Sequence, residues 1–160
     1  MKKALLLIFS ACMVACTSID CPVQHSVMAH YAVMTSDLTA ADTLRDTLSI
    51  TTKKMDRKDT LLLNQAIGVT SFSVNVSYTN PEDTLFFQFK NYPYMAIDTV
   101  WMKKENTPHF ESVDCSASYF HSITAIRTTH HAIDTVTINN PSIDYDPQRV
   151  HFHLRLKSHN

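Results

Sequence analysis

The sequence predicts an all-β protein, an antiparallel two-sheet sandwich of immunoglobulin-like size with eight or nine short strands. Three observations predict it. Polar and apolar residues alternate with a period of two through most of the chain, which sorts side chains onto the two faces of a strand. Prolines and asparagines separate the alternating runs, and no convincing amphipathic helix lies between them. Such a series of short strands is typical of a sandwich or a barrel.

Strands are predicted wherever this alternation is sustained. In chain order they cover 27–34, 47–51, 60–63, 71–78, 84–89, 98–103, 119–128, 133–139 and 150–157. The last is the clearest, because an apolar residue occupies every even position from Val150 to Leu156. The first and the third are weaker. Segment 27–34 also fits a helix, since Val27, Tyr31 and Met34 lie at helical spacing.

Turn-forming residues separate the strands. An Asn stands near a proline within 79–83, 90–93, 105–108 and 139–141. Asn side chains bond nearby backbone groups, and proline has no N–H to donate to a sheet. We therefore expect a turn at each of these four places.

Length and composition favour one globular domain and exclude several classes of protein. The chain has 160 residues, of which 44% are hydrophobic and 18% are charged, and this suits a single packed core. The single glycine excludes collagen-like repeats and glycine-rich phosphate loops. The 14 Lys and Arg residues are scattered and are balanced by 15 Asp and Glu, so we expect no nucleic-acid partner.

The amino terminus has the features of an export signal. Lys2 and Lys3 precede a mostly apolar stretch, 4–15, which is too short to span a bilayer comfortably. This stretch ends in Met13-Val14-Ala15-Cys16, which resembles the lipobox of bacterial lipoproteins. The resemblance implies that Cys16 is diacylated on its sulfur and anchors the protein to a membrane.

The lipobox also sets the expected domain boundaries. We expect a signal peptide at 1–15, a lipidated tether at 16–24 and one β-sandwich domain at 25–160. Cys12 is a poorer lipid site, because few apolar residues precede it, and an ordinary secretory peptide is the alternative. No acidic residue follows Cys16 directly, which favours attachment to the outer membrane, facing the periplasm.

Two of the four cysteines remain after processing and lipidation, Cys21 and Cys115. Export places them in an oxidising compartment, where an isolated pair is most simply a disulfide. The loop that it would close, about 95 residues long, corresponds to a stabilisation of about 4–5 kcal/mol from chain entropy. Neither cysteine has a second cysteine at CxxC spacing, and a free or catalytic thiol is the alternative.

The tripeptide Asp-Thr-Leu or Asp-Thr-Val occurs six times without a fixed period. The local explanation is that Asp ends a turn, Thr lies on the solvent face of the next strand and the aliphatic residue begins its buried face. The tripeptide also resembles the O-glycosylation sequon of Bacteroidota, which implies that one or more of the hydroxyls carries a glycan. The candidates are Thr43, Thr47, Thr60, Thr84, Thr99 and Thr135.

Several segments together resemble a family of small Bacteroidales lipoproteins known only as a domain of unknown function. They are Ser18-Ile19-Asp20-Cys21-Pro22, Asn80-Pro81-Glu82-Asp83-Thr84, Asp98-Thr99-Val100-Trp101, Phe110-Glu111-Ser112-Val113-Asp114-Cys115 and Ile133-Asp134-Thr135-Val136. The resemblance implies an anchored β domain. Because that family is uncharacterised, it supplies no catalytic or binding residue.

Nine histidines raise the question of a metal site. His151 and His153 lie two residues apart, hence on one face of a strand, about 6.5–7 Å apart along it. This spacing is compatible with two ligands of Cu or Zn. Arg155 and Lys157 belong to the same face and oppose a third cation, so solvated strand histidines are the preferred interpretation and a metal site is the alternative.

A second candidate for binding is an aromatic patch. Trp101, with Phe86, Tyr92 and Tyr94, is a candidate surface for sugar or protein contact, because the alternation places Phe86 on the solvent face. Packing in the core or at a sheet edge is the alternative.

Together these features predict a lipid-anchored cell-envelope protein that acts as a non-enzymatic binding or structural module. We expect a membrane contact through the lipid, an envelope protein or glycan as partner, and neither cofactor nor catalytic residue. A periplasmic metal-binding protein using His151 and His153 is the alternative function.

Overall fold

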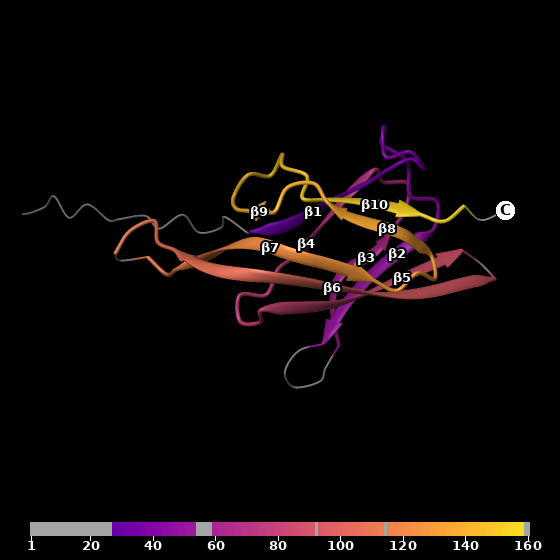
Figure 1. The fold of residues 1–160 in the computed structure, drawn as a ribbon. Helices are drawn as coiled ribbons and strands as arrows, with labels where there is room; N and C mark the ends of the chain where they lie inside the picture. The colour runs from indigo at the N-terminus through magenta and orange to yellow at the C-terminus, as the bar shows by residue number, and fades with distance from the viewer. Residues whose placement is uncertain (1–26, 54–58, 92, 114, 159–160) are drawn as a thin grey trace, which may run out of the picture.

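A computed structural model describes residues 27–53, 59–91, 93–113 and 115–158, and ten strands lie among them (Figure 1). The strands are β1 (Met28–Val33), β2 (Thr47–Lys53), β3 (Asp59–Ala66), β4 (Ser71–Asn75), β5 (Glu82–Asn91), β6 (Tyr94–His109), β7 (Ser118–Thr128), β8 (Ile133–Ile138), β9 (Ser142–Ile143) and β10 (Phe152–Leu156). No helix occurs in the described ranges. The predicted domain boundaries and Cys16 involve residues before 27, outside these ranges.

The strands form two sheets. One has four strands in the order β4-β1-β10-β8, and the other has six in the order β3-β2-β5-β6-β7-β9. The all-β, two-sheet prediction is confirmed, with ten strands rather than eight or nine. The additional strand, β9, has only two residues and is too short to show an alternation. Segment 27–34 forms strand β1 and not a helix.

The two sheets differ from a purely antiparallel sandwich at one place. Strand β1 runs parallel to β10, with Tyr31 opposite Phe152, whereas the other pairs of described strands are antiparallel. The Tyr31 ring stacks on Phe152 and on Phe72, at centroid distances of 4.7 and 5.0 Å. These three buried aromatic rings join neighbouring strands of the four-stranded sheet, and each contributes about 1.5–3 kcal/mol through burial.

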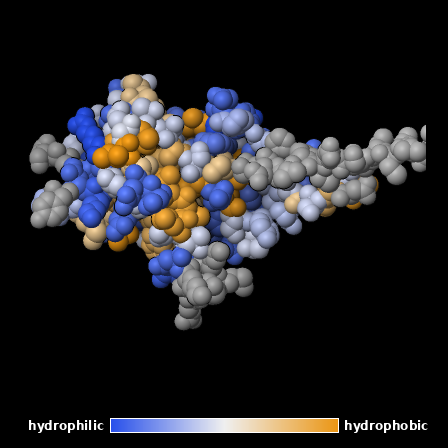
Figure 2. Space-filling model, turned by 180° about the vertical axis from the view of Figure 1, so that it is seen from behind, coloured by the Kyte–Doolittle hydropathy of each residue, from blue (hydrophilic) through white to orange (hydrophobic). Residues whose placement is uncertain are grey.

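The alternation sorts side chains as predicted along β5. Leu85, Phe87 and Phe89 are buried, while Phe86 and Gln88 lie on the other face and are partly exposed. Seen from behind, hydrophobic side chains gather in a band across the middle of the body, with hydrophilic side chains on either side (Figure 2). Apolar surface is therefore also open to solvent, and such surface is a common mark of contact sites.

The Asp-Thr tripeptides follow the same alternation. In the tripeptides that begin at Asp46, Asp83 and Asp98, Asp and the aliphatic residue two positions later share the inner face, and the Thr between them lies on the other face. The tripeptide in β3 is reversed, because Asp59 and Leu61 are exposed and Thr60 is partly buried. Asp46, Asp83 and Asp98 are accordingly buried. The tripeptide is therefore a sheet motif as well as a turn motif.

The carboxylate of Asp98 gives this motif a structural role. It accepts hydrogen bonds of 2.7–2.8 Å from the Thr129 hydroxyl and from the backbone N–H groups of His131, Ala132 and Ile133. Burial raises the pKa of Asp98, but these four hydrogen bonds outweigh burial and hold the pKa below its ordinary value. The motif thus ties the turn between β7 and β8 to the sheet.

The predicted turn at 105–108 is wrong, because these residues continue β6. The β6–β7 hairpin extends beyond β5, whose pairing with β6 ends at Glu82 and Lys103 (Figure 1). From residue 104 onward β6 pairs only with β7, so one of its edges has no neighbouring strand. Pro108 is tolerated there because its missing N–H interrupts no ladder on that open edge.

Candidate functional site

Two adjoining cavities lie where the chain crosses from β4 in one sheet to β5 in the other. The larger has a volume of about 740 Å³, and its lining includes Thr60 of β3, Asn75 of β4, Thr84 of β5 and, between β4 and β5, Tyr78. The smaller has a volume of about 570 Å³ and shares Asn75, Val76 and Tyr78 with the larger one. We call the two cavities together the Tyr78 cleft.

The smaller cavity is completed by strand β7. Ser118, Tyr119 and His121 line it beside Tyr78. The rings of Tyr78 and Tyr119 stack with centroids 5.1 Å apart and an angle of 19° between their planes. Because 61% of Tyr78 is exposed, an aromatic surface remains open between the two cavities.

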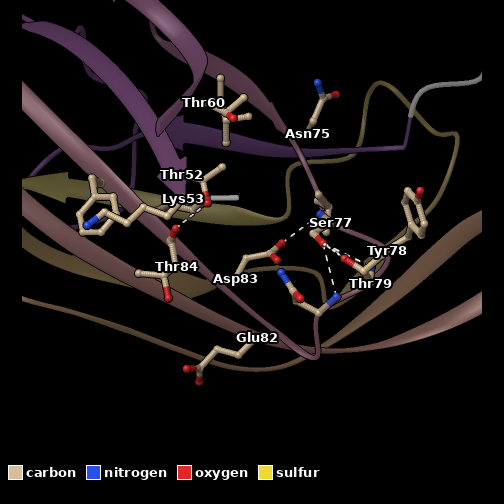
Figure 3. Close-up of a pocket in the computed structure, with 15 residues that line it drawn as sticks. Thr52, Lys53, Thr60, Asn75, Ser77, Tyr78, Thr79, Glu82, Asp83 and Thr84 are labelled. Carbon is tan, nitrogen blue, oxygen red and sulfur yellow. Dashed lines mark hydrogen bonds between the residues drawn. The ribbon is translucent and has the colours of Figure 1, made fainter. Parts of the chain in front are cut away.

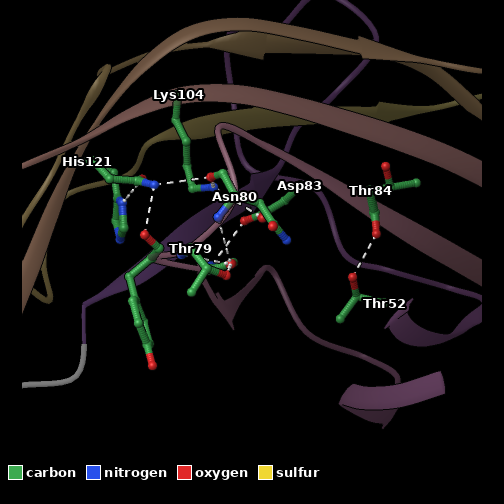
Figure 4. A network of polar contacts seen from close by, with 10 residues as sticks. Thr52, Thr79, Asn80, Asp83, Thr84, Lys104 and His121 are labelled. Atoms are coloured by element: carbon green, nitrogen blue, oxygen red, sulfur yellow. Dashed lines mark hydrogen bonds and ion pairs between the residues drawn. The ribbon is translucent and has the colours of Figure 1, made fainter. Parts of the chain in front are cut away.

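A buried ion pair supports the loop that carries Tyr78. The Lys104 ammonium donates a hydrogen bond of 2.7 Å to the carbonyl of Asn80 and lies 3.1 Å from the Asp83 carboxylate (Figure 4). Asp83 also accepts a hydrogen bond of 3.0 Å from the backbone N–H of Ser77 (Figure 3). The Lys104 side chain has no exposed surface, so the ion pair fixes the loop from beneath.

The sequence places this ion pair through strand alternation. Lys104 follows Val100 and Met102 on the inner face of β6, and Asp83 precedes Leu85 on the inner face of β5. Asp83 pairs with Met102, so Lys104 is its diagonal neighbour across the two strands. Burial raises the pKa of Asp83 and lowers the pKa of Lys104, and the opposite charge of each partner offsets part of that shift.

The hydrogen bonds of Asn106 determine the tautomer of His121. The amide nitrogen of Asn106 donates to the carbonyls of Tyr78 and Asn80, at 3.0 and 3.1 Å. Its amide oxygen, 2.8 Å from His121 Nδ1, is therefore an acceptor, and Nδ1 carries the proton. Nε2 then presents a lone pair, and Figure 4 shows this second ring nitrogen pointing away from the polar network.

His121 is neutral at ordinary pH. Burial, assisted by the Lys104 charge, lowers the pKa of His121 to about 4. The residue is only 4% exposed, yet it lines the smaller cavity. Among the described residues no group bonds its Nε2, so the cleft contains a hydrogen-bond acceptor that is accessible from the cavity.

Both carboxylates at the cleft form ion pairs, and the one lysine in the lining lies against an aromatic ring. Glu82 forms an ion pair of 3.1 Å with Arg127, and the Lys53 ammonium lies over the Phe86 ring, 5.6 Å from its centroid. Asp83 is paired with Lys104. The remaining polar lining consists of neutral hydroxyl and amide groups, so the cleft suits a neutral ligand.

The aromatic patch predicted around Trp101 is not formed as a cluster. Trp101 and Phe86 are partly buried, and the Arg127 guanidinium covers Trp101 at 4.3 Å from the ring centroid. Tyr94 is exposed at the start of β6, far along the strand from Trp101, and Tyr92 lies outside the described residues.

The metal alternative is not supported by the described residues. His151 is not a solvated strand histidine, because it is fully buried and stacks on His30 with ring centroids 5.3 Å apart. Its Nδ1 accepts a hydrogen bond of 3.0 Å from the His30 backbone N–H, a consequence of the parallel pairing of β1 and β10. His153 is partly buried. Within the described ranges no three His, Cys, Asp or Glu side chains gather as a metal site requires.

The residues predicted to carry the lipid, the disulfide and the glycans differ in whether the structure describes them and in how exposed they are. Cys16 and Cys21 lie outside the described residues, so the Cys21–Cys115 disulfide and the lipid stay predictions; Cys115 is partly buried in the β6–β7 connection. Of the glycosylation candidates, Thr43 is exposed, while Thr60 and Thr84 line the larger cavity. The other three, Thr47, Thr99 and Thr135, are partly buried on strands.

Sequence reasoning missed Tyr78, Tyr119 and His121 as site residues. The available signals were weak: Tyr78 directly precedes a predicted turn, and Lys104 occupies an apolar position of an alternating strand. A buried charge in such a position requires a partner, and that partner cannot be named before the strands are paired.

Comparisons with known proteins identify the chain at the level of a family. No helix in the described residues is long and apolar enough to cross a membrane. No curated protein and no solved structure matches the chain. A model described as "Family of unknown function (DUF6452)" matches residues 47–156, from the first residue of β2 to the last residue of β10. The chain therefore belongs to this family of unknown function.

Proposed function

We propose that the protein is a lipid-anchored cell-envelope lipoprotein of the Bacteroidales type, whose β-sandwich is a non-enzymatic binding module. The export features of residues 1–16 support the anchor. The Tyr78 cleft supports binding, because its volume lies within the range of about 300–1,000 Å³ typical of ligand sites.

The pairing of charges in the cleft is the observation that carries this proposal. A general acid or base needs a titratable group free to reach the substrate. Lys104 and Asp83 neutralise each other and bond the loop, and the lowered pKa of His121, about 4, makes its imidazole a weak base. The cleft therefore offers neutral contacts for recognition rather than groups for proton transfer.

The anchor is tested by replacing its cysteine. In the native cells, Cys16→Ser should remove the mass of the acyl chains and leave residues 1–15 uncleaved, because acylation of the sulfur precedes cleavage. Cys12→Ser is the matched control and should change neither. A native protein that carries no acyl chains, or that retains residues 1–15, contradicts the envelope assignment.

The binding role is tested by photo-crosslinking in the native cells. A photoreactive amino acid at position 78 should yield a covalent adduct, detected as a discrete mass increase. Tyr94, another exposed tyrosine, provides the control position and should yield none. Equal yields at the two positions, or no adduct at position 78, contradict a binding site in the cleft.

The disulfide and the glycans belong to the same proposal. Non-reducing peptide mapping of the native protein should recover Cys21 joined to Cys115. A glycan on Thr60 or Thr84 would fill the larger cavity, whereas a glycan on Thr43 would leave it open. The mass of the native protein, compared with that of the chain made in a host without the modification, therefore decides whether the cleft is accessible.

A further inference from the structure

We infer that the Tyr78 cleft binds a neutral oligosaccharide across its two cavities, with His121 Nε2 accepting a hydrogen bond from a sugar hydroxyl. This inference rests on the proposed binding function and adds the chemical class of the ligand. It depends on three properties of the cleft: its neutral lining, its exposed aromatic surface and its unbonded polar groups.

The carboxylates of the lining are already paired, which disfavours recognition by charge. Asp83 is paired with Lys104, Glu82 with Arg127, and Lys53 lies against the Phe86 ring. A cationic ligand would have to compete with Lys104 or Arg127 for its carboxylates, and an anionic ligand would meet only Lys53, the one lining charge without an acidic partner among the described residues. The ligand that fits this lining carries hydrogen-bonding groups without ionic ones.

The tyrosine pair provides a surface for an amphipathic ring. Tyr119 supports Tyr78 from one side by stacking, and most of the Tyr78 side chain remains exposed at the boundary of the two cavities. An aromatic face packs against apolar C–H groups while the rim stays hydrated. A pyranose has such a C–H face and a rim of hydroxyls, and two linked sugars would place one unit on each side of Tyr78.

The unbonded polar groups match sugar hydroxyls. His121 is 4% exposed and lines the smaller cavity, and its Nε2 has no hydrogen-bond partner among the described residues. This nitrogen is not among the fully buried atoms without a partner, so a donor in the cavity can reach it. In the described part of the chain, the side chains of Thr60 and Asn75 also have no hydrogen-bond partner, and Figure 3 shows both beside the larger cavity. These groups accept and donate in the same way as the hydroxyls of a sugar.

The experiment uses the full chain, exported by its host and purified in detergent, on an array of neutral oligosaccharides of two to about six units. Acidic oligosaccharides and short peptides are present on the same array. The affinity for the best neutral oligosaccharide is then measured by calorimetry. Tyr78→Ala and His121→Phe should each weaken binding about tenfold, through loss of the aromatic contact or of one hydrogen bond.

Matched controls separate a local effect from a loss of folding. Tyr94→Ala and His130→Phe replace an exposed tyrosine and an exposed histidine outside the cleft and should leave the affinity unchanged. Asn75→Ala changes an exposed, unbonded side chain that both cavities share, so it should weaken binding with no change in the thermal melting temperature. If His121→Phe does not fold, Tyr78→Ala and Asn75→Ala still decide the question.

The outcomes distinguish the inference from the proposed function. Neutral oligosaccharide binding that weakens in the cleft variants and not in the controls supports both. Binding only of peptides or acidic oligosaccharides, weakened by Tyr78→Ala, overturns the sugar inference and leaves the binding function in place. Neutral oligosaccharide binding unaffected by every cleft variant overturns this site for sugars. Absence of any bound ligand, together with no crosslink at position 78, overturns both.

Discussion

His121 and His151 lie in opposite halves of the sandwich, and both rings are buried. Burial is the main cause that lowers the pKa of each to about 4; a neighbouring cation, Lys104, assists at His121, and His30 and Arg149 assist at His151. The proton lies on Nδ1 of His121 but on Nε2 of His151, because His151 Nδ1 accepts the His30 N–H. The two rings therefore have similar lowered pKa values but carry the proton on different nitrogens.

The two histidines also differ in what their free nitrogen meets. His151 Nε2 is buried in the protein and has no hydrogen-bond partner among the described residues, whereas His121 lines a cavity. A lowered pKa alone therefore does not mark a binding site. Access decides the role: His151 joins β1 to the segment before β10, and His121 presents an acceptor to a ligand.

The largest expected effect concerns the ion pair that supports the open site. Lys104→Met should lower the free energy of unfolding by about 3–5 kcal/mol, because it leaves the Asp83 charge buried without its partner. Urea unfolding followed by tryptophan fluorescence measures this change. The exposed neighbour provides the control: Lys103→Met should change the value by less than about 0.5 kcal/mol.

A second substitution tests whether the unpaired charge is the cause. Adding Asp83→Leu to Lys104→Met removes the buried carboxylate and should recover most of the loss, provided that the apolar pair packs. A double variant no more stable than Lys104→Met would show that the bonds of Lys104 to the Asn80 loop, rather than the charge of Asp83, carry the stability.

The next largest effect is common to both histidines and appears on acidification. The pKa of each is lower in the folded protein than its ordinary 6.5, so the unfolded chain binds more protons between pH 6.5 and about 4. Stability should therefore fall as the pH falls through this range, by up to about 3 kcal/mol for each histidine. The raised pKa of Asp83 acts in the opposite direction and offsets part of the loss.

Two measurements check this dependence. Urea midpoints should decrease steadily from about pH 7 to about pH 4. In NMR spectra the rings of His121 and His151 should keep neutral-imidazole shifts down to about pH 4, and burial also lowers the pKa of His30 below its ordinary value. Constant urea midpoints, or nine rings that all titrate near pH 6.5, would contradict the burial of His121 and His151.

The smallest effect separates the buried His151 from His121, which lines the cleft. The Ser73 hydroxyl lies 2.6 Å from His30 Nδ1, beside the ring that stacks on His151. Ser73→Ala should cost about 1 kcal/mol through loss of this hydrogen bond and should leave ligand binding at the cleft unchanged. Ser71→Ala, at an exposed position of the same strand, should change neither quantity. Weaker binding in Ser73→Ala would mean that the two regions are coupled.

Much of the fold is visible in the sequence, because alternation is a local property of a strand. The burial of Leu85, Phe87 and Phe89 follows from it, as does the outward position of Thr84. The prediction fails where a neighbouring strand ends: Pro108 looks like a turn residue, yet it lies in β6 because that stretch has one open edge. Strand pairing of this kind is not a local property.

The candidate site was less predictable than the fold. Its residues come from β2, β3, β4, β5, β7 and the segment before β5, and none carries a short motif that names a ligand. The sequence alone determined which side chains share a face of each strand, hence that Asp83 and Lys104 point inward. Only the tertiary structure decided that they meet, that Asn106 orients His121 and that His151 is sealed, because hydrogen bonds and burial depend on which distant strands become neighbours.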